Sequence, residues 1–134
     1  MQPAEPSPDR PLAYFWHGLE QGRFLLQQCN GCSKFFFYPR VLCPHCGHPE
    51  WDWREASGEG VIYSYTGVYK TSKGPEPDYI VALIDLAEGP RMMAQLINCT
   101  ESSIAVGDRV RAVITAHDEG KRVDFEPIEK GKRP

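Results

Sequence analysis

The chain has 134 residues, 41% of them hydrophobic, and a formal net charge of −3 at pH 7. That length corresponds to about one domain, or to two very small modules that share a core. The acidic balance argues against a nucleic-acid binder that relies on an overall positive field. Twelve prolines and twelve glycines disfavour long helices and favour strands joined by tight turns.

The first residues carry no sign of a targeting segment. Met1-Gln2-Pro3-Ala4-Glu5-Pro6 lacks the positive start and the apolar run of a signal peptide. No apolar run in the chain approaches the ~18 residues needed to span a membrane. We therefore expect a cytoplasmic protein without a membrane partner.

Residues 1–10 are rich in proline and polar side chains, which predicts a flexible lead-in. A short helix is expected over residues 11–22, with Asp9 as its N-cap, Pro11 in its first turn and Gly22 at its end. Its apolar residues recur at helical spacing and predict one stripe: Leu12, Phe15, Trp16 and Leu19. Such a stripe either packs against the core of the chain or docks on another subunit or a ligand.

Four of the five cysteines form two Cys-x-x-Cys pairs. Cys29 and Cys32 make the first pair, and Cys43 and Cys46 follow after a spacer of ten residues. Two such turns that face each other place four thiolates at the corners of a tetrahedron, which predicts a structural Zn²⁺ site. The other interpretations are two disulfides, free buried thiols or a rubredoxin-type iron centre.

The residues beside these cysteines predict a small ribbon over residues 23–56. Gly31 and Gly47 are expected to supply positive φ next to the ligands. Short strands are expected at residues 24–28, 34–40 and 51–54. Because successive side chains of a strand point to opposite faces, Phe35, Phe36 and Phe37 cannot all point inward. Some of them should lie against a neighbouring module or at the surface, and packing around the metal module is the simpler interpretation.

Beyond residue 57 the hydrophobic pattern changes to a period of two residues. Strands are expected at residues 61–68, 79–86, 91–97, 109–115 and 123–127, with residues 79–86 buried on both faces. Five strands with tight turns in about 70 residues suit an OB-fold barrel over residues 57–128. Residues 129–134 form a polar tail with Lys130, Lys132 and Arg133. The predicted class is mainly β: an N-terminal helix, a rubredoxin-like zinc ribbon and a five-stranded OB-fold barrel.

The order of these features resembles domain-of-unknown-function family thirty-five, which joins a rubredoxin-like zinc ribbon to an OB-fold. The resemblance rests on Gly22-Arg23-Phe24-Leu25-Leu26-Gln27-Gln28-Cys29-x-x-Cys32, Pro39-Arg40-x-x-Cys43-Pro44-x-Cys46-Gly47, Trp53, Ser57-Gly58-x-Gly60-Val61-Ile62-Tyr63-Ser64-Tyr65-Thr66, Glu88-Gly89-Pro90-Arg91 and Val106-Gly107-Asp108. It runs from about Pro11 to Pro127, nearly the whole chain. The metal ligands of the family carry over onto Cys29, Cys32, Cys43 and Cys46.

The resemblance also implies a function. Members of the family assemble with thiolase-like enzymes, namely thiolases, aldolases and acyltransferases that act on acyl-CoA, or with acyl-CoA hydratases. In these assemblies the small protein holds subunits together and offers a surface for acyl-CoA, without catalytic residues of its own. This implies a non-catalytic accessory subunit of an acyl-CoA-processing complex. Which acyl-CoA is processed, which enzyme is the partner, and the stoichiometry stay open.

The sequence itself contains no catalytic constellation. It lacks a Gly-x-Ser-x-Gly elbow, a phosphate-binding glycine loop and a His-Glu-x-x-His motif. Cys99 is the one spare thiol and is interpreted as a packing residue. His45 and His48 lie in or beside the second Cys-x-x-Cys turn, but four thiols already complete a site.

Two groups of residues are candidates for contact with a partner or with acyl-CoA. The basic residues are able to meet CoA phosphates as charge-assisted donors, although solvated surface charges are the simpler interpretation. The aromatic residues are candidates where they reach the surface, although packing within the chain is the simpler interpretation. Together the candidates are Phe15, Trp16, Phe35, Phe36, Phe37, Arg40, Lys70, Lys73 and Arg91.

The main alternative is a protein that binds single-stranded nucleic acid. OB barrels stack bases on strand aromatics, here Tyr63, Tyr65 and Tyr69, and zinc ribbons also occur in nucleic-acid proteins. The acidic balance and the lack of a dense Lys/Arg stripe argue against it. An electron carrier with iron in the four-cysteine site is a third possibility.

Overall fold

The computed structural model describes residues 7, 10–70, 74–118 and 120–128. The chain divides into two compact units. The first consists of Met1–Ser57 with the short pieces Glu88–Pro90 and Ile114–Arg122, and the second of Gly58–Ala87, Arg91–Val113 and Val123–Pro134. The predicted tail at residues 129–134, and all of the predicted lead-in except Ser7 and Arg10, lie outside the described residues. Among the described residues, no helix is long and apolar enough to cross a membrane.

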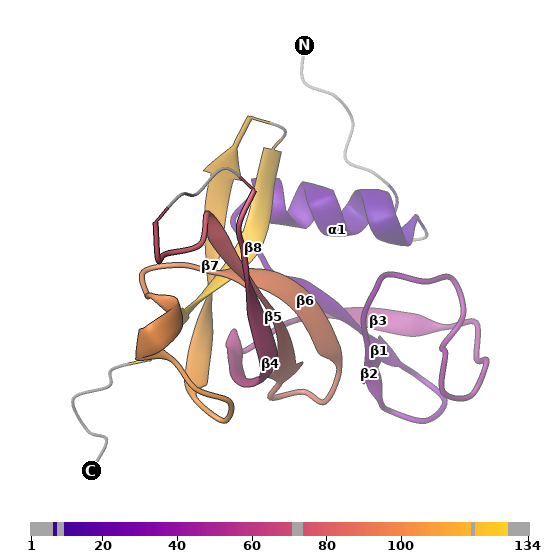
Figure 1. Ribbon diagram of the computed structural model, residues 1–134. Coiled ribbons are helices and arrows are strands. Elements are labelled where there is room, and N and C mark those ends of the chain that lie inside the picture. Colours follow the sequence, from indigo (N-terminus) through magenta and orange to yellow (C-terminus); the bar gives the residue numbers. More distant parts are fainter. Residues whose placement is uncertain (1–6, 8–9, 71–73, 119, 129–134) are drawn as a thin grey trace. The chain divides into compact units, whose positions relative to one another are not determined.

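The helix α1 spans Pro11–Glu20, with Pro11 in its first turn (Figure 1). Its N-cap position is Arg10, which makes no side-chain cap bond, so the expected cap at Asp9 is wrong by one residue. At the other end Gly22 has φ +80°, and the N–H of Arg23 donates to the carbonyl oxygen of Gly18 at 2.8 Å. Such a 6→1 bond defines a Schellman motif, and the expected end of the helix at Gly22 is confirmed.

The helix buries a different face from the predicted stripe. Phe15 and Leu19 are buried as expected, but Leu12 and Trp16 are exposed. A Cβ atom on the buried Gly18 would lie 2.9 Å from Cδ1 of Leu25. The helix therefore turns its glycine toward the first strand, because only glycine admits so close an approach, and this rotation carries Leu12 and Trp16 outward.

Three strands form the ribbon sheet, in the order β2-β1-β3. They are β1 (Leu25–Cys29), β2 (Phe35–Phe36) and β3 (Trp51–Glu55), and both pairings are antiparallel. Gln27 lies opposite Phe36 in one pair and opposite Trp53 in the other. Packing beyond the sheet joins Trp53 to Tyr14 of α1, with ring centroids 5.1 Å apart. The predicted ribbon is present, with its strands between Leu25 and Glu55.

Five strands form a closed barrel in the order β4-β5-β6-β8-β7 (Figure 1). They are β4 (Glu59–Val68), β5 (Tyr79–Leu86), β6 (Arg91–Leu96), β7 (Arg109–His117) and β8 (Gly120–Pro127), and a 3₁₀ turn, η1 (Glu101–Ser103), lies between β6 and β7. The prediction of a five-stranded barrel is confirmed.

Strand β5 differs from its prediction in one respect. Burial alternates along it: Ile80, Ala82, Ile84 and Leu86 are buried, whereas the residues between them are only half-buried. A closed barrel has one interior face per strand, so an apolar run does not require burial on both sides. The prediction that this strand is buried on both faces is therefore wrong: its outward-facing residues are half-buried.

The barrel closes between β6 and β8, which pair in parallel with Leu96 opposite Phe125. Glu126, one residue further on β8, accepts a hydrogen bond from Nε of Arg111 at 2.7 Å and another from Nδ2 of Asn98 at 2.6 Å. The side chain of Glu126 is mostly buried, unlike that of Arg111. One carboxylate thus joins β8 to its neighbour β7 and to the residues that follow β6.

This closure predicts a pH-dependent stability. The bond from Arg111, followed by that from Asn98, lowers the pKa of the Glu126 carboxyl below its ordinary value. A lowered folded-state pKa stabilises the fold above the unfolded-state pKa of about 4.3, and this stabilisation is lost as pH falls through the folded value. We expect Glu126→Gln to be less stable than the wild type at pH 7, with the difference narrowing below about pH 4. Urea unfolding at several pH values measures this difference. A constant difference across the range contradicts the assignment.

Candidate metal centre

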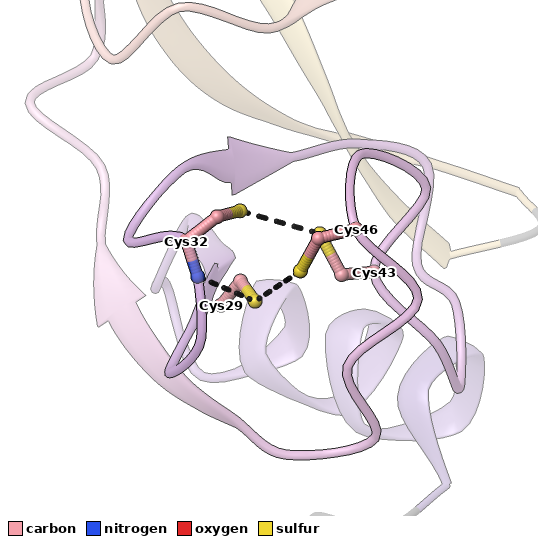
Figure 2. Close-up of side chains that lie close together, drawn as sticks. All are labelled: Cys29, Cys32, Cys43 and Cys46. Carbon is pink, nitrogen blue, oxygen red and sulfur yellow. Dashed lines mark hydrogen bonds between the residues drawn. The ribbon is translucent and has the colours of Figure 1, made fainter.

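Four sulfur atoms converge in the first unit. The Sγ atoms of Cys29, Cys32, Cys43 and Cys46 all lie within 4.8 Å of one another. Cys29 and Cys46 have their sulfurs 3.5 Å apart, and Cys32 and Cys43 have theirs 3.7 Å apart. Figure 2 shows the four side chains pointing toward one another from the two Cys-x-x-Cys turns.

These distances suit a tetrahedral metal ion. A regular tetrahedron with metal–sulfur bonds of about 2.3 Å has sulfur–sulfur edges of about 3.8 Å. A disulfide needs sulfurs at about 2.05 Å, well below either separation. A four-thiolate donor set also matches the preference of zinc and of iron for soft ligands. The cluster therefore fits a structural metal ion.

Backbone N–H groups surround the sulfurs. Sγ of Cys29 accepts from the N–H of Gly31 at 3.2 Å and from that of Cys32 at 3.3 Å, and Sγ of Cys43 accepts from His45 N at 3.3 Å. The bond from Cys32 is the main cause that lowers the pKa of the Cys29 thiol to about 6, against the opposing effect of burial. Such donors stabilise thiolates, the form that binds a metal.

The pKa of the Cys46 thiol is shifted in the opposite direction, upward. The N–H of His48 lowers its pKa, but the neighbouring thiols, Cys29 first, and burial outweigh that effect and raise the pKa to about 11. Like charges so close together disfavour one another. Four thiolates coexist at these distances only when a cation at their centre balances the charge, as a metal ion does.

The backbone geometry of the first Cys-x-x-Cys turn differs from the prediction that Gly31 supplies a positive φ. Gly47 has the expected positive φ of +79°, but in the first turn the residue with positive φ is Ser33, at +66°, and not Gly31. Gly31 is needed for space, because a Cβ atom there would lie 2.7 Å from Cδ2 of His48. Nδ1 of His48 in turn accepts from the N–H of Glu50 at 3.1 Å, which holds the ring in place.

The other candidate ligands lie outside the cluster of four. His48 is held by Glu50, and Nε2 of His45 lies 3.3 Å from the carbonyl oxygen of Phe35. Cys99 is half-buried and belongs to the other unit. Neither histidine nor Cys99 is part of the group of close ligand atoms found among the described residues.

The aromatic candidates divide into buried and exposed residues. Phe15 and Phe36 are buried, which agrees with packing inside the chain and not with the exposure that contact with a partner requires. Phe36 forms a small core with Cys29 and Cys43, on the metal side of its strand. Phe35 and Phe37 are half-buried, and Trp16 is exposed.

The basic candidates also differ. Arg91 is engaged within the barrel unit, because its Nε donates to Asp85 at 2.6 Å and its guanidinium lies 3.5 Å from the ring centroid of Tyr63. Arg40 and Lys70 are exposed, and Lys73 lies outside the described residues. The structure brings the four cysteines together, whereas Arg40 belongs to the first unit and Lys70 and Arg91 to the second.

The tyrosines proposed for base stacking have other contacts. Tyr63 lies against Arg91, as described above. The hydroxyl of Tyr65 donates to the carbonyl oxygen of Ile104 at 3.1 Å, and that of Tyr69 donates to Glu101 at 2.7 Å. These contacts give no support to a nucleic-acid interface.

One residue near the centre was missed by the sequence reasoning. Gln27 is 1% exposed, and its side-chain amide donates to the carbonyl oxygen of Arg40 at 2.7 Å and accepts from its N–H at 2.9 Å. A polar residue in the run Leu25-Leu26-Gln27 hints at a buried hydrogen bond, but nothing in the sequence identifies its partner.

The geometry first defines a class: a rubredoxin-like ribbon with a four-cysteine centre, followed by an OB-type barrel. Family comparison agrees, since residues 16–52 match the family model described as "ChsH2, rubredoxin-like zinc ribbon domain" and residues 53–115 match "ChsH2, C-terminal OB-fold domain". The chain therefore belongs to domain-of-unknown-function family thirty-five (DUF35), in the group of these ChsH2 domains, as the resemblance predicted.

Three relatives illustrate this membership. A "DUF35 domain-containing scaffold protein" of Methanothermobacter thermautotrophicus is 34% identical over 99 residues, 70% of this chain and 74% of that protein. The "Probable enoyl-CoA hydratase alpha subunit" of Thermomonospora curvata is 34% identical over 103 residues, 76% of this chain. The chain spans only 32% of the length of that subunit. A solved structure titled "Ltp2-ChsH2(DUF35) aldolase" has 31% identity and a TM-score of 0.76, and the match covers 94% of this chain and 98% of that one.

The contact between Gly31 and His48 predicts a localised sensitivity. In Gly31→Ala the new Cβ would meet the ring of His48, and the turn that presents Cys29 and Cys32 must shift. We expect a loss of about 1–3 kcal/mol in the free energy of unfolding, as for other overpacked sites. Gly74→Ala is the matched control, because a Cβ there meets nothing within 4 Å. Chemical denaturation of both variants measures the difference, and equal stabilities would show that the contact carries no constraint.

Proposed function

We propose that this chain is an accessory, scaffold-type subunit of an acyl-CoA-processing complex with a thiolase-like enzyme, an aldolase or a hydratase. The observation that carries the proposal is the similarity along nearly the whole chain to a DUF35 chain whose solved structure is titled as an aldolase with Ltp2. A DUF35 relative named as a scaffold protein, and another relative named as a hydratase subunit, support the same role.

We propose that the chain itself is not catalytic. A centre closed by four thiolates has no open coordination position for a substrate or an attacking water. Its function is then to hold a fold together, and the reaction belongs to the partner subunit.

The metal of the proposed centre is Zn²⁺, held by Cys29, Cys32, Cys43 and Cys46. When bound, zinc supplies four strong bonds to sulfur and no redox chemistry. The chain's own residues prepare the site: the N–H groups of Gly31 and Cys32 stabilise the Cys29 thiolate, and Gly31 leaves space for His48. Thiolates kept for zinc imply a reducing compartment, and so a cytoplasmic protein.

This assignment predicts the metal content of the purified protein. We expect a colourless protein with one equivalent of zinc by elemental mass spectrometry; a red-brown protein containing iron would contradict it. Cys43→Ser should lose most of the zinc and unfold the ribbon, because metal binding and folding of such modules are coupled, typically by about 10 kcal/mol or more. Cys99→Ser, which changes a half-buried cysteine of the other unit, should keep its zinc and its fold.

Co-expression tests the accessory role. The chain is produced together with each thiolase-like, aldolase and hydratase enzyme of its own organism in turn, and each mixture is analysed by size-exclusion chromatography with light scattering. We expect a single complex, and an enzyme whose turnover or solubility falls without this chain. The purified chain alone should turn over no acyl-CoA. Separate elution, with enzyme activity indifferent to this chain, would contradict the proposal.

A further inference from the structure

The segment between the two Cys-x-x-Cys turns exposes three large apolar side chains within five residues. Tyr38 is 50% exposed, Val41 61% and Leu42 51%. Single exposed apolar residues are normal on a protein surface, but neighbouring ones mark interaction sites. Here three of five consecutive residues, Tyr38–Leu42, are large, apolar and exposed. We call the segment Tyr38–Leu42, which lies between the two Cys-x-x-Cys turns (the zinc knuckles), the inter-knuckle loop.

The loop is held in place from inside. The buried amide of Gln27 makes two hydrogen bonds to the backbone of Arg40, at the centre of the loop. The next residue after the loop, Cys43, is a buried member of the metal cluster, and its N–H donates to the carbonyl oxygen of His48 at 3.0 Å. A loop fixed at its centre and at its end loses little conformational freedom when it binds.

The beginning of the loop is also anchored. The ring of Tyr38 lies against Phe37, with centroids 4.4 Å apart, and Phe37 lies against the buried Phe15 of α1 at 5.3 Å. All of these residues belong to the first unit. The exposed side chains of the loop are therefore presented by a rigid base of aromatic contacts, hydrogen bonds and the metal cluster.

The charge of the loop indicates the kind of surface that it fits. Arg40 is exposed and is the loop's one charged residue, and no Asp or Glu occurs between Asn30 and Pro49, although the whole chain has a net charge of −3. Tyrosine and arginine beside aliphatic residues form the typical centre of a protein interface. The complementary surface is an apolar pocket with a carboxylate at its edge.

We propose that the inter-knuckle loop is the element through which this chain docks onto its partner enzyme, with Val41 and Leu42 in an apolar pocket and Arg40 paired with a carboxylate. This inference rests on the proposed accessory function and specifies the surface that performs it. It also links the metal to assembly, because the ion holds the end of the loop.

The test uses the full chain with its metal bound and, as the probe, the purified acyl-CoA enzyme that forms a complex with it in the co-expression experiment above. Affinity is measured by biolayer interferometry for Leu42→Asp and Arg40→Glu. Each is expected to weaken binding by about tenfold or more, as truncations at the centre of an interface do. Met93→Asp is the matched control, because Met93 is 56% exposed on β6 in the other unit, and it should bind within about twofold of the wild type.

A further variant separates the shape of the loop from its composition. Gln27→Leu keeps every exposed side chain and removes both bonds to Arg40. It should weaken binding while zinc content and the far-UV spectrum match those of the wild type. Zinc content and the far-UV spectrum are also measured for Leu42→Asp and Arg40→Glu. Because these two variants change only exposed side chains, they test the proposal even if Gln27→Leu fails to fold.

The outcomes distinguish failure of the proposed docking loop from failure of the proposed accessory function. If the wild type binds the enzyme and both Leu42→Asp and Arg40→Glu bind within about twofold of it, the loop is not the docking element, although the accessory function stands. If the wild type does not bind at all, the accessory function fails and this inference fails with it. Binding of the wild type to vesicles of phosphatidylcholine and phosphatidylserine that Leu42→Asp abolishes overturns the inference in favour of a membrane surface.

Discussion

The convergence of four sulfur atoms is the constraint on which the first unit depends. The ribbon around them has a very small core, formed by Cys29, Phe36 and Cys43 with Cys32 and Trp51 packed against it. Strand β2 is only two residues long. So little apolar burial around the two Cys-x-x-Cys turns does not offset the conformational entropy lost when these turns become ordered. A metal ion bonded to four sulfurs replaces the missing core, and the strands are short because the metal holds their ends.

The barrel is stabilised in another way. Its strands close on themselves, so it has no unpaired edge strand, and its interior is filled by the alternating residues of β5 together with Phe125 of β8. Glu126 connects strands that are distant in sequence. The first unit thus adds a four-sulfur centre to its buried apolar residues, whereas the barrel unit depends on burial and on the pairing of its strands.

The centre also organises the surface beside it. The residues that complete the cluster, Cys32 and Cys43, begin and end the spacer that contains the exposed Tyr38, Val41 and Leu42. Gln27, two positions before Cys29 on β1, fixes the middle of that spacer through Arg40. The same strand, β1, therefore supplies one cysteine of the cluster and the glutamine that holds the middle of the loop.

Local patterns in the sequence were sufficient for the metal cluster, the five barrel strands and the end of the helix at Gly22. Each depends on neighbours in the chain: the spacing of two Cys-x-x-Cys turns, the alternation of β-strands, and a glycine at the helix end. The tertiary structure alone decided which face of α1 is buried, that Gly31 gives space to His48, and that Gln27 bonds to Arg40. These features depend on contacts between segments that approach only after folding, and their partners leave no periodic pattern in the sequence.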